Sequence, residues 1–163
     1  MALIKMSMKI KNLLFIPLLL VFVAACDSSP PVEGRVIQTQ SGESIVRPHN
    51  ESQIAAGEMI YQRDCAQCHG VNGEGDPEWR KRDADGMYPP PPLNGTGHAW
   101  HHPTTFLQGR IKNGSEAGQG KMPAWDGKLS DDEVDAVIAW FQSQWPDQLY
   151  AAWYEINQRA LRR

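Results

Sequence analysis

Cysteine, positive charge and long apolar runs are all scarce in this sequence. Its 163 residues include three cysteines, and the formal net charge is −3 at pH 7. Such a charge argues against a nucleic-acid-binding protein, because phosphate binding requires a concentrated basic surface. The length suits one domain with accessory segments and excludes two full catalytic domains. Apolar residues make up 41% of the chain, which is enough for a core and excludes wholesale disorder.

Strand patterns and internal repeats are also missing, and loop-forming residues are frequent. The chain has 14 glycines and 12 prolines, and the run Pro89–Pro92 cannot lie in a helix interior or a central strand. Helical spacing of apolar residues follows Ser52, Pro103 and the capping box Ser130–Glu133, and it returns in residues 147–163. We therefore expect an all-α fold with long ordered loops.

The first 25 residues have the composition of an export signal. Three lysines precede an apolar run from Leu13 to Ala25, which at about 13 residues is too short to cross a bilayer as a helix. The run ends in small residues directly before Cys26. This resembles the lipobox of bacterial lipoproteins, in which cleavage leaves an N-terminal cysteine that carries lipid. Asp27 then favours the inner membrane. Ordinary cleavage after Ala25, with Cys26 as a chance thiol, is the alternative.

Removal of this signal changes the charge and defines the remaining segments. The chain from Cys26 keeps 13 basic and 19 acidic residues, a formal net charge of −6. Residues 26–50 are rich in Ser, Pro, Gly, Gln and Glu, and we expect a flexible tether without helical or strand periodicity. We then expect a domain over residues 51–146 and a helical extension over 147–163 that packs on it. The predicted protein is lipid-anchored and faces the periplasm.

The residues that carry chemistry are concentrated in Cys65-Ala66-Gln67-Cys68-His69. C-x-x-C-H is the attachment motif of c-type haem, because two thiols three positions apart can add to the porphyrin vinyl groups and the next residue offers an imidazole to the iron. A redox dithiol would need a βαβ setting, and a zinc site would need further ligands. A disulfide would leave His69 without a role. The motif therefore predicts one covalently bound haem c.

Around this motif the chain resembles class I cytochrome c. Gly57 and Tyr61 precede C-x-x-C-H-G, and a Pro-x-Leu stretch, a later Met-Pro pair and a closing amphipathic helix follow. The resemblance covers residues 52–145. It implies a small helical domain wrapped around one low-spin haem that passes single electrons. It also implies a close crossing of the first and last helices, where Gly57 and Tyr61 would meet Val137, Trp140 and Phe141.

The resemblance further indicates the second iron ligand and the partner of His69. Met122, in the Met-Pro pair 53 residues after His69, matches the methionine loop of the family. A thioether favours the reduced iron and raises its potential. Met59, just before the haem cysteines, and Met87, in the proline-rich loop, are the competing methionines. The ring N–H of His69 is expected to donate to the carbonyl of Pro91, the first residue of the Pro-x-Leu element.

Several other side chains carry weaker hypotheses. His98, His101 and His102 could bind copper or zinc, although they lie in a loop and one of them could instead cap a helix or contact a haem propionate. Arg110 and Trp125 could also contact propionates. The basic stretch 80–82 is expected to be a solvated loop, with docking of a partner as the alternative.

Together these observations favour an electron carrier that does no bond chemistry on a substrate and meets its redox partners in brief contacts. A haem subunit of a larger oxidase or dehydrogenase is one alternative. Another is a gas or redox sensor, or a peroxidase-like enzyme, in which Met122 leaves the iron. Copper handling at the histidine cluster, with the haem as reductant, is a third.

Overall fold

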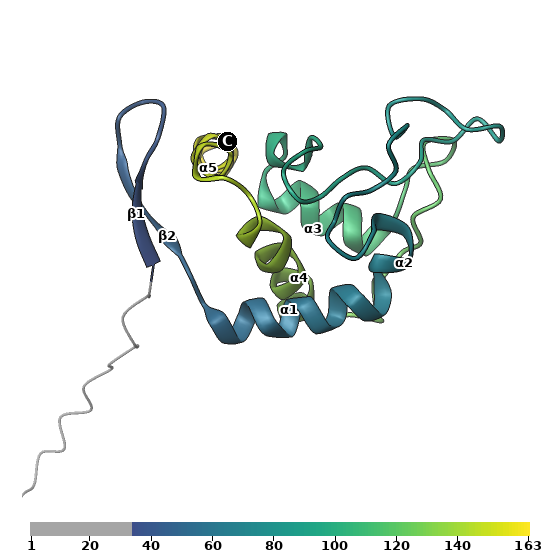
Figure 1. Ribbon diagram of the computed structural model, residues 1–163, viewed down its shortest axis with the longest axis horizontal. Helices are drawn as coiled ribbons and strands as arrows, with labels where there is room; N and C mark the ends of the chain where they lie inside the picture. Colours follow the sequence, from purple (N-terminus) through teal and green to yellow (C-terminus); the bar gives the residue numbers. More distant parts are fainter. Residues whose placement is uncertain (1–33) are drawn as a thin grey trace, which may run out of the picture. The chain divides into compact units, whose positions relative to one another are not determined.

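The computed structural model describes residues 34–163, which belong to one compact unit. A two-stranded sheet precedes the helices (Figure 1). The elements are β1 (Gly34–Gln38), β2 (Ser44–Pro48), α1 (Glu51–Asp64), α2 (Ala66–His69), the 3₁₀ turn η1 (Ala99–His101), α3 (Thr104–Asn113), α4 (Asp131–Ser143) and α5 (Asp147–Leu161). The prediction of a mainly helical fold with long connecting loops is confirmed.

The predicted export signal lies outside the described residues, and so do Cys26 and Asp27. Within residues 34–163, every helix is too short or too polar to cross a bilayer.

Side-chain caps determine where two of the helices begin. At α4, Ser130 Oγ accepts a hydrogen bond from the Glu133 amide at 3.2 Å, and the Glu133 carboxylate accepts one from the Ser130 amide at 2.8 Å, so the predicted capping box is confirmed. Helix α1 begins earlier than its sequence suggests. Its N-cap is Asn50, whose Oδ1 accepts from the Gln53 amide at 3.0 Å and from the Ser52 hydroxyl at 2.8 Å. Ser52 therefore supports the cap from inside the helix.

The close crossing of α1 and α4 is the centre of the core (Figure 1). A Cβ added to Gly57 would lie 1.9 Å from the backbone oxygen of Ala136 and 3.0 Å from Cβ of Trp140. One turn further on, the rings of Tyr61 and Trp140 are 3.9 Å apart, and Tyr61 is 0% exposed. The predicted helix crossing at Gly57 and Tyr61 is therefore confirmed, and it depends on a residue without a side chain.

The segment before α1 contains a β-hairpin, and the prediction of an unstructured tether is wrong for residues 34–48. The two strands pair antiparallel with Val36 opposite Val46. Ile37 and Ile45 are buried, whereas Val36 and Val46 are exposed, so the strands do alternate between two faces. This alternation is hidden in the sequence because each strand is short and Arg47 occupies a buried position beside the isoleucines.

Arg47 attaches the hairpin to the end of α4. It is 5% exposed, and its guanidinium donates to the carbonyl oxygens of Gln142 at 2.7 Å and Trp145 at 2.8 Å and to Asp147 Oδ1 at 2.7 Å. Carbonyls at the end of a helix lack intrahelical donors and carry partial negative charge. A buried arginine at this point satisfies them and neutralises Asp147.

Helix α5 packs on the rest of the described unit through its aromatic face, and Tyr150, Ala151 and Trp153 are buried there. It also completes α3. The Thr104 amide at the start of α3, which follows the N-cap Pro103, donates to Asn157 Oδ1 of α5 at 2.9 Å. A proline cannot supply a side-chain cap, so the cap comes from another helix.

Candidate haem site

The two cysteines of the motif belong to the single helical turn α2 that directly follows α1: Cys65 is its N-cap and Cys68 lies within it. Cys65 ends α1, where its amide donates to the Tyr61 carbonyl at 2.8 Å, and it also begins α2, where its own carbonyl accepts from His69 at 3.0 Å. Cys65 is partly buried and Cys68 is exposed, and both are free thiols. Burial, together with the nearby charge of Asp64, raises the pKa of the Cys65 thiol to about 11. The turn thus presents two free thiols three positions apart, and that of Cys65 is protonated at neutral pH.

His69 is held by its Nδ1 atom. The imidazole is 9% exposed, and Nδ1 lies 2.9 Å from the carbonyl oxygen of Pro91. A carbonyl can only accept a hydrogen bond, so Nδ1 carries the proton and Nε2 keeps a lone pair available to a metal. Burial lowers the pKa of His69, which favours the neutral ring that can act as a ligand.

Two glycine-rich turns hold the proline segment beside His69. The Gly75 amide donates to the His69 carbonyl at 2.7 Å, and the Leu93 amide donates to the Gly73 carbonyl at 2.7 Å. Gly75 has φ +62°, and a Cβ there would lie 2.4 Å from the Pro92 nitrogen. Only glycine combines this backbone conformation with so close an approach. The backbone of these turns thereby sets the position of the Pro91 carbonyl.

Tyr61 connects the helix crossing to the haem motif. Its hydroxyl donates to the carbonyl of Gly70, the residue after His69, at 2.8 Å. Burial raises the pKa of Tyr61, so the phenol stays protonated and keeps this hydrogen bond at every physiological pH. The end of α2 is therefore anchored to the same tyrosine that packs on Trp140 in α4.

The candidate methionines differ in environment. Met59 is 71% exposed on α1. Met122 is partly buried in the loop before α4, where its amide donates to Ser115 Oγ at 3.2 Å and its carbonyl accepts from the Ser115 amide at 2.9 Å. Met87 is also partly buried, and its amide donates to Asp83 Oδ1 at 2.9 Å. Met87 and Met122, both partly buried, thus lie in loops with well-defined backbone contacts.

The loops that carry Met87 and Met122 lie against each other. Lys121 donates to Asp83 Oδ2 at 3.1 Å and also pairs with Asp85. The Tyr88 amide donates to the Gln119 carbonyl at 3.2 Å. Because the two loops are in contact, position alone does not separate Met87 from Met122 as the candidate iron ligand.

The histidine cluster is engaged in aromatic stacking. His98 stacks on Trp79 with ring centroids 5.0 Å apart, and His102 stacks on Phe106 at 4.0 Å, while His101 lies against a tryptophan. In the part of the chain that the structure describes, His, Cys, Asp and Glu nowhere gather in a group of three or more suited to a metal ion. The structure therefore gives no support to a copper or zinc site at these histidines.

The other basic and aromatic candidates mostly contact the protein itself. Arg110 pairs with Glu116 at 3.0 Å and donates to the Gly114 carbonyl. The Trp125 amide donates to two carbonyls at the end of α3. In the basic stretch, Arg80 stacks on Trp79 and Lys81 pairs with Glu78. Arg82 donates to the carbonyls of residues 86 and 118 and stacks on Tyr88. A role at a propionate stays a prediction for Arg110 and Trp125.

Trp145 is a supporting residue that the sequence pattern did not indicate. Its indole N–H donates to the Leu93 carbonyl at 2.7 Å, and the residue is 2% exposed. It therefore fixes the far end of the proline segment from the α4–α5 junction. A lone tryptophan before a proline carries no spacing signal, so its role becomes visible only in the folded chain.

The donor set fits a covalently attached haem. Two free thiols stand one helical turn apart, an imidazole with its Nε2 lone pair free follows them, and a partly buried thioether lies elsewhere in the unit. Thiol addition to the two vinyl groups, with an imidazole in the next residue to face the iron, is the chemistry by which c-type haem is attached. The fold and this site define the class: a class I c-type cytochrome, which carries covalently bound haem c and transfers electrons.

Comparison with known proteins places the chain within that class. It belongs to the family described as "Cytochrome C oxidase, cbb3-type, subunit III", whose model matches residues 52–141, more than half of the chain. Cytochrome c6 of Tetradesmus obliquus is 33% identical over 97 residues, which cover 56% of this chain and 90% of the relative. Cytochrome c6 of Chlorolobion braunii is 29% identical over 94 residues, which cover 58% of this chain and 93% of the relative.

One solved structure matches part of this chain. The reducing HAO-like protein complex of Kuenenia stuttgartiensis contains a chain that is 27% identical, with a TM-score of 0.46. The match covers 64% of this chain and 50% of that one, so the chain spans half the length of this structural neighbour.

Proposed function

We propose that the protein is a membrane-tethered one-electron carrier whose haem c is attached through Cys65 and Cys68 and ligated by His69 and Met122. The observation that carries this proposal is the 2.9 Å contact between His69 Nδ1 and the Pro91 carbonyl. It leaves the lone pair of Nε2 free in a buried, neutral imidazole that directly follows Cys68 in the chain, as an iron ligand requires. Membership of the cytochrome family supports the same conclusion.

Each residue that we assign to the haem site has a defined task in this proposal. When bound, haem c supplies an iron that accepts and releases one electron. Cys65 and Cys68 hold it in place, and the Pro91 carbonyl fixes the ring orientation of His69 and increases its basicity. Met122 supplies a neutral sulfur donor that favours the reduced state. If His69 and Met122 both bind the iron, the site would pass electrons without binding a substrate.

Export and anchoring complete the proposal. The apolar run up to Ala25 directs the chain out of the cytoplasm, a lipid on Cys26 holds it at the inner membrane, and the domain faces the periplasm. Replacement of Cys26 by serine is then expected to release the protein from membranes and to abolish incorporation of radiolabelled lipid. Continued membrane association of the wild-type chain without any lipid label would contradict the anchor.

The choice of Met122 over Met87 is tested by paired variants. Met122→Ala is expected to give a high-spin or water-ligated haem with a lower reduction potential, because the sulfur donor that stabilises ferrous iron is lost. Met87→Ala is the matched control, since it removes the same side chain from the adjoining loop, and its spectrum and potential should stay unchanged. The opposite pattern would assign the ligand to Met87.

Binding of carbon monoxide distinguishes an electron carrier from a sensor or a peroxidase-like enzyme. If Met122 stays bound in the ferrous state, carbon monoxide binds poorly to the wild-type protein and readily to Met122→Ala. Tight binding of carbon monoxide to both forms would favour the sensor.

A second candidate function is that of a haem subunit in a larger oxidoreductase complex. The description of the matching family, which names an oxidase subunit, favours it. Affinity purification from detergent-solubilised membranes separates the two: a carrier is recovered alone, whereas a subunit is recovered with its partners in fixed proportion.

A further inference from the structure

The loop that carries Met122 is closed at its base by its own backbone. We name residues 115–122 the Met122 loop. The Ser115 amide donates to the Met122 carbonyl at 2.9 Å, and the Met122 amide donates to Ser115 Oγ at 3.2 Å. Residues 116–119, which lie between these two ends, are exposed. The position of this part of the loop therefore depends on contacts with neighbouring segments.

Arg82 connects the Met122 loop to the segment of residues 82–88, which we name the Met87 turn. Its guanidinium donates to the Gly118 carbonyl in the Met122 loop at 2.7 Å and to the Gly86 carbonyl in its own turn. The same guanidinium lies over the ring of Tyr88, 4.4 Å from the centroid. One charged side chain therefore joins the two segments.

Lys121, the residue directly before Met122, makes a second connection. Its amine donates to Asp83 Oδ2 at 3.1 Å and also pairs with Asp85. The other carboxylate oxygen of Asp83 accepts from the amides of Asp85 and Met87, each at 2.9 Å, so Asp83 also shapes the Met87 turn. Replacement of the Asp85 carboxylate therefore weakens the connection to Lys121 and leaves the hydrogen bonds of Asp83 within the turn.

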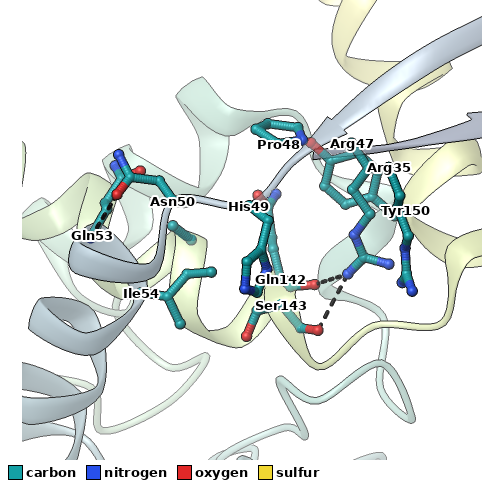
Figure 2. A pocket seen from close by; sticks show the side chains of 11 residues that line it. Arg35, Arg47, Pro48, His49, Asn50, Gln53, Ile54, Gln142, Ser143 and Tyr150 are labelled. Carbon is teal, nitrogen blue, oxygen red and sulfur yellow. Dashed lines mark hydrogen bonds between the residues drawn. The ribbon is translucent and has the colours of Figure 1, made fainter. Parts of the chain in front are cut away.

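Exposure distinguishes these contacts from the buried arginine contact at the hairpin. Arg47 is 5% exposed and donates to the carbonyls of Gln142 and Ser143 (Figure 2). Arg82 is exposed, and the Lys121 side chain is 59% exposed. Water and salt compete with exposed charged contacts, which stabilise a structure only weakly. The connections at Arg82 and Lys121 can therefore open while the rest of the domain stays folded.

We propose that Arg82 and Asp85 are positioning residues for Met122. They hold the Met122 loop closed through Gly118 and Lys121, and the closed loop keeps the thioether on the iron. This inference rests on the proposed ligation by Met122. Carbon monoxide competes with the thioether, so its apparent affinity is proportional to the fraction of molecules in which the thioether has left. Loss of either connection increases that fraction.

Carbon monoxide titration of the ferrous, haem-loaded protein tests the proposal. Arg82→Gln and Asp85→Asn are each expected to raise the affinity by up to about fivefold, the size of one exposed charged contact. The double variant should raise it by more than either single variant, because the two side chains hold different residues of the Met122 loop.

Lys81→Gln and Glu78→Gln are the matched controls. They remove the same charges from an ion pair that lies outside both segments, and the two side chains are 76% and 60% exposed. Their affinity for carbon monoxide should equal that of the wild-type protein. All four replaced side chains are exposed, so the variants are expected to fold, which denaturant titration checks.

Met122→Ala separates failure of this inference from failure of the proposed function. If Met122→Ala binds carbon monoxide much more tightly than wild type while Arg82→Gln, Asp85→Asn and the double variant keep the wild-type affinity, the positioning role is overturned and ligation by Met122 stands. An equal rise in the two controls overturns the positioning role as well. If Met122→Ala itself keeps the wild-type affinity, ligation by Met122 is wrong, and this inference is overturned with it.

Discussion

At the level of single residues, the haem site depends on where one proton lies. The Pro91 carbonyl accepts from His69 Nδ1, so Nε2 is left with its lone pair, and burial keeps the ring neutral by lowering the pKa of His69. The carbonyl itself is held by backbone contacts at Gly73 and Gly75 and by the indole of Trp145. The orientation of the His69 ring thus rests on a backbone carbonyl, which a side-chain substitution at Pro91 does not remove, and the segment that carries this carbonyl is further held by the Trp145 indole.

The stacked histidines predict a pH dependence of stability. Partial burial, together with the charges of His101 and Arg80, lowers the pKa of His98, and burial beside His98, His101 and Arg110 lowers that of His102. The unfolded chain therefore binds more protons below its own histidine pKa of about 6.5. The contribution of these two histidines to the free energy of unfolding is thus fully present above that pH and is lost as the pH falls below it.

Chemical denaturation at pH 7.5 and pH 5.0 measures this effect. The wild-type protein should unfold at lower denaturant concentration at pH 5.0, and the double variant with glutamine at positions 98 and 102 should lose less stability over the same interval. An identical decrease in both proteins would mean that other groups are responsible.

At the level of secondary-structure elements, the crossing of α1 and α4 tolerates no side chain at Gly57. A Cβ there meets the backbone of Ala136 at 1.9 and 2.4 Å, so the helices have to separate. Gly57→Ala is expected to lower the free energy of unfolding by about 1–3 kcal/mol or more. Denaturant titration of the holoprotein measures the change.

Gly109 in α3 provides the control for this substitution. The nearest atom to a Cβ at Gly109 is Asn113 Nδ2 at 3.9 Å, so alanine fits there without displacement. Gly109→Ala should raise stability by about 0.5–1 kcal/mol, because alanine loses less conformational freedom in a helix than glycine. Equal effects of the two substitutions would contradict the packing argument.

The same elements show how far the sequence determines the fold. Ser130 and Glu133 are three residues apart, so the beginning of α4 is readable from the chain, and the glycine and aromatic spacing of α1 indicates its partner face. The hairpin was not readable, because Arg47 is buried by contacts with carbonyls almost one hundred residues away. The same holds for Asn157 as the cap of α3. Local patterns predict elements, whereas tertiary hydrogen bonds remain hidden.

The residues of the candidate haem site also fall into those that the sequence indicates and those that only the folded chain reveals. C-x-x-C-H is a local motif, so Cys65, Cys68 and His69 are indicated by spacing alone, and the resemblance to class I cytochrome c adds Pro91 and Met122. Trp145 acquires its role only through a contact formed by folding.

At the level of the whole molecule, the chain from Cys26 carries a formal net charge of −6. Such a charge attracts cationic partners and repels anionic ones over distances that added salt shortens. The oxidation rate with ferricyanide, an anion, should therefore rise with ionic strength, and the reduction rate with a hexaammine ruthenium complex, a cation, should fall. Stopped-flow measurement of both rates in one salt series checks this. Changes of the same sign with both reagents would contradict control by net charge.

Covalent attachment of haem at Cys65 and Cys68 is the central claim, and peptide mass spectrometry of the purified protein tests it most directly. The protein is produced together with haem-attachment machinery, extracted with acid acetone and digested. We predict that the colour stays with the protein and that the peptide containing Cys65-Ala66-Gln67-Cys68-His69 carries the mass of one haem. Loss of all colour to the solvent, with recovery of that peptide bearing two unmodified thiols, would contradict the account.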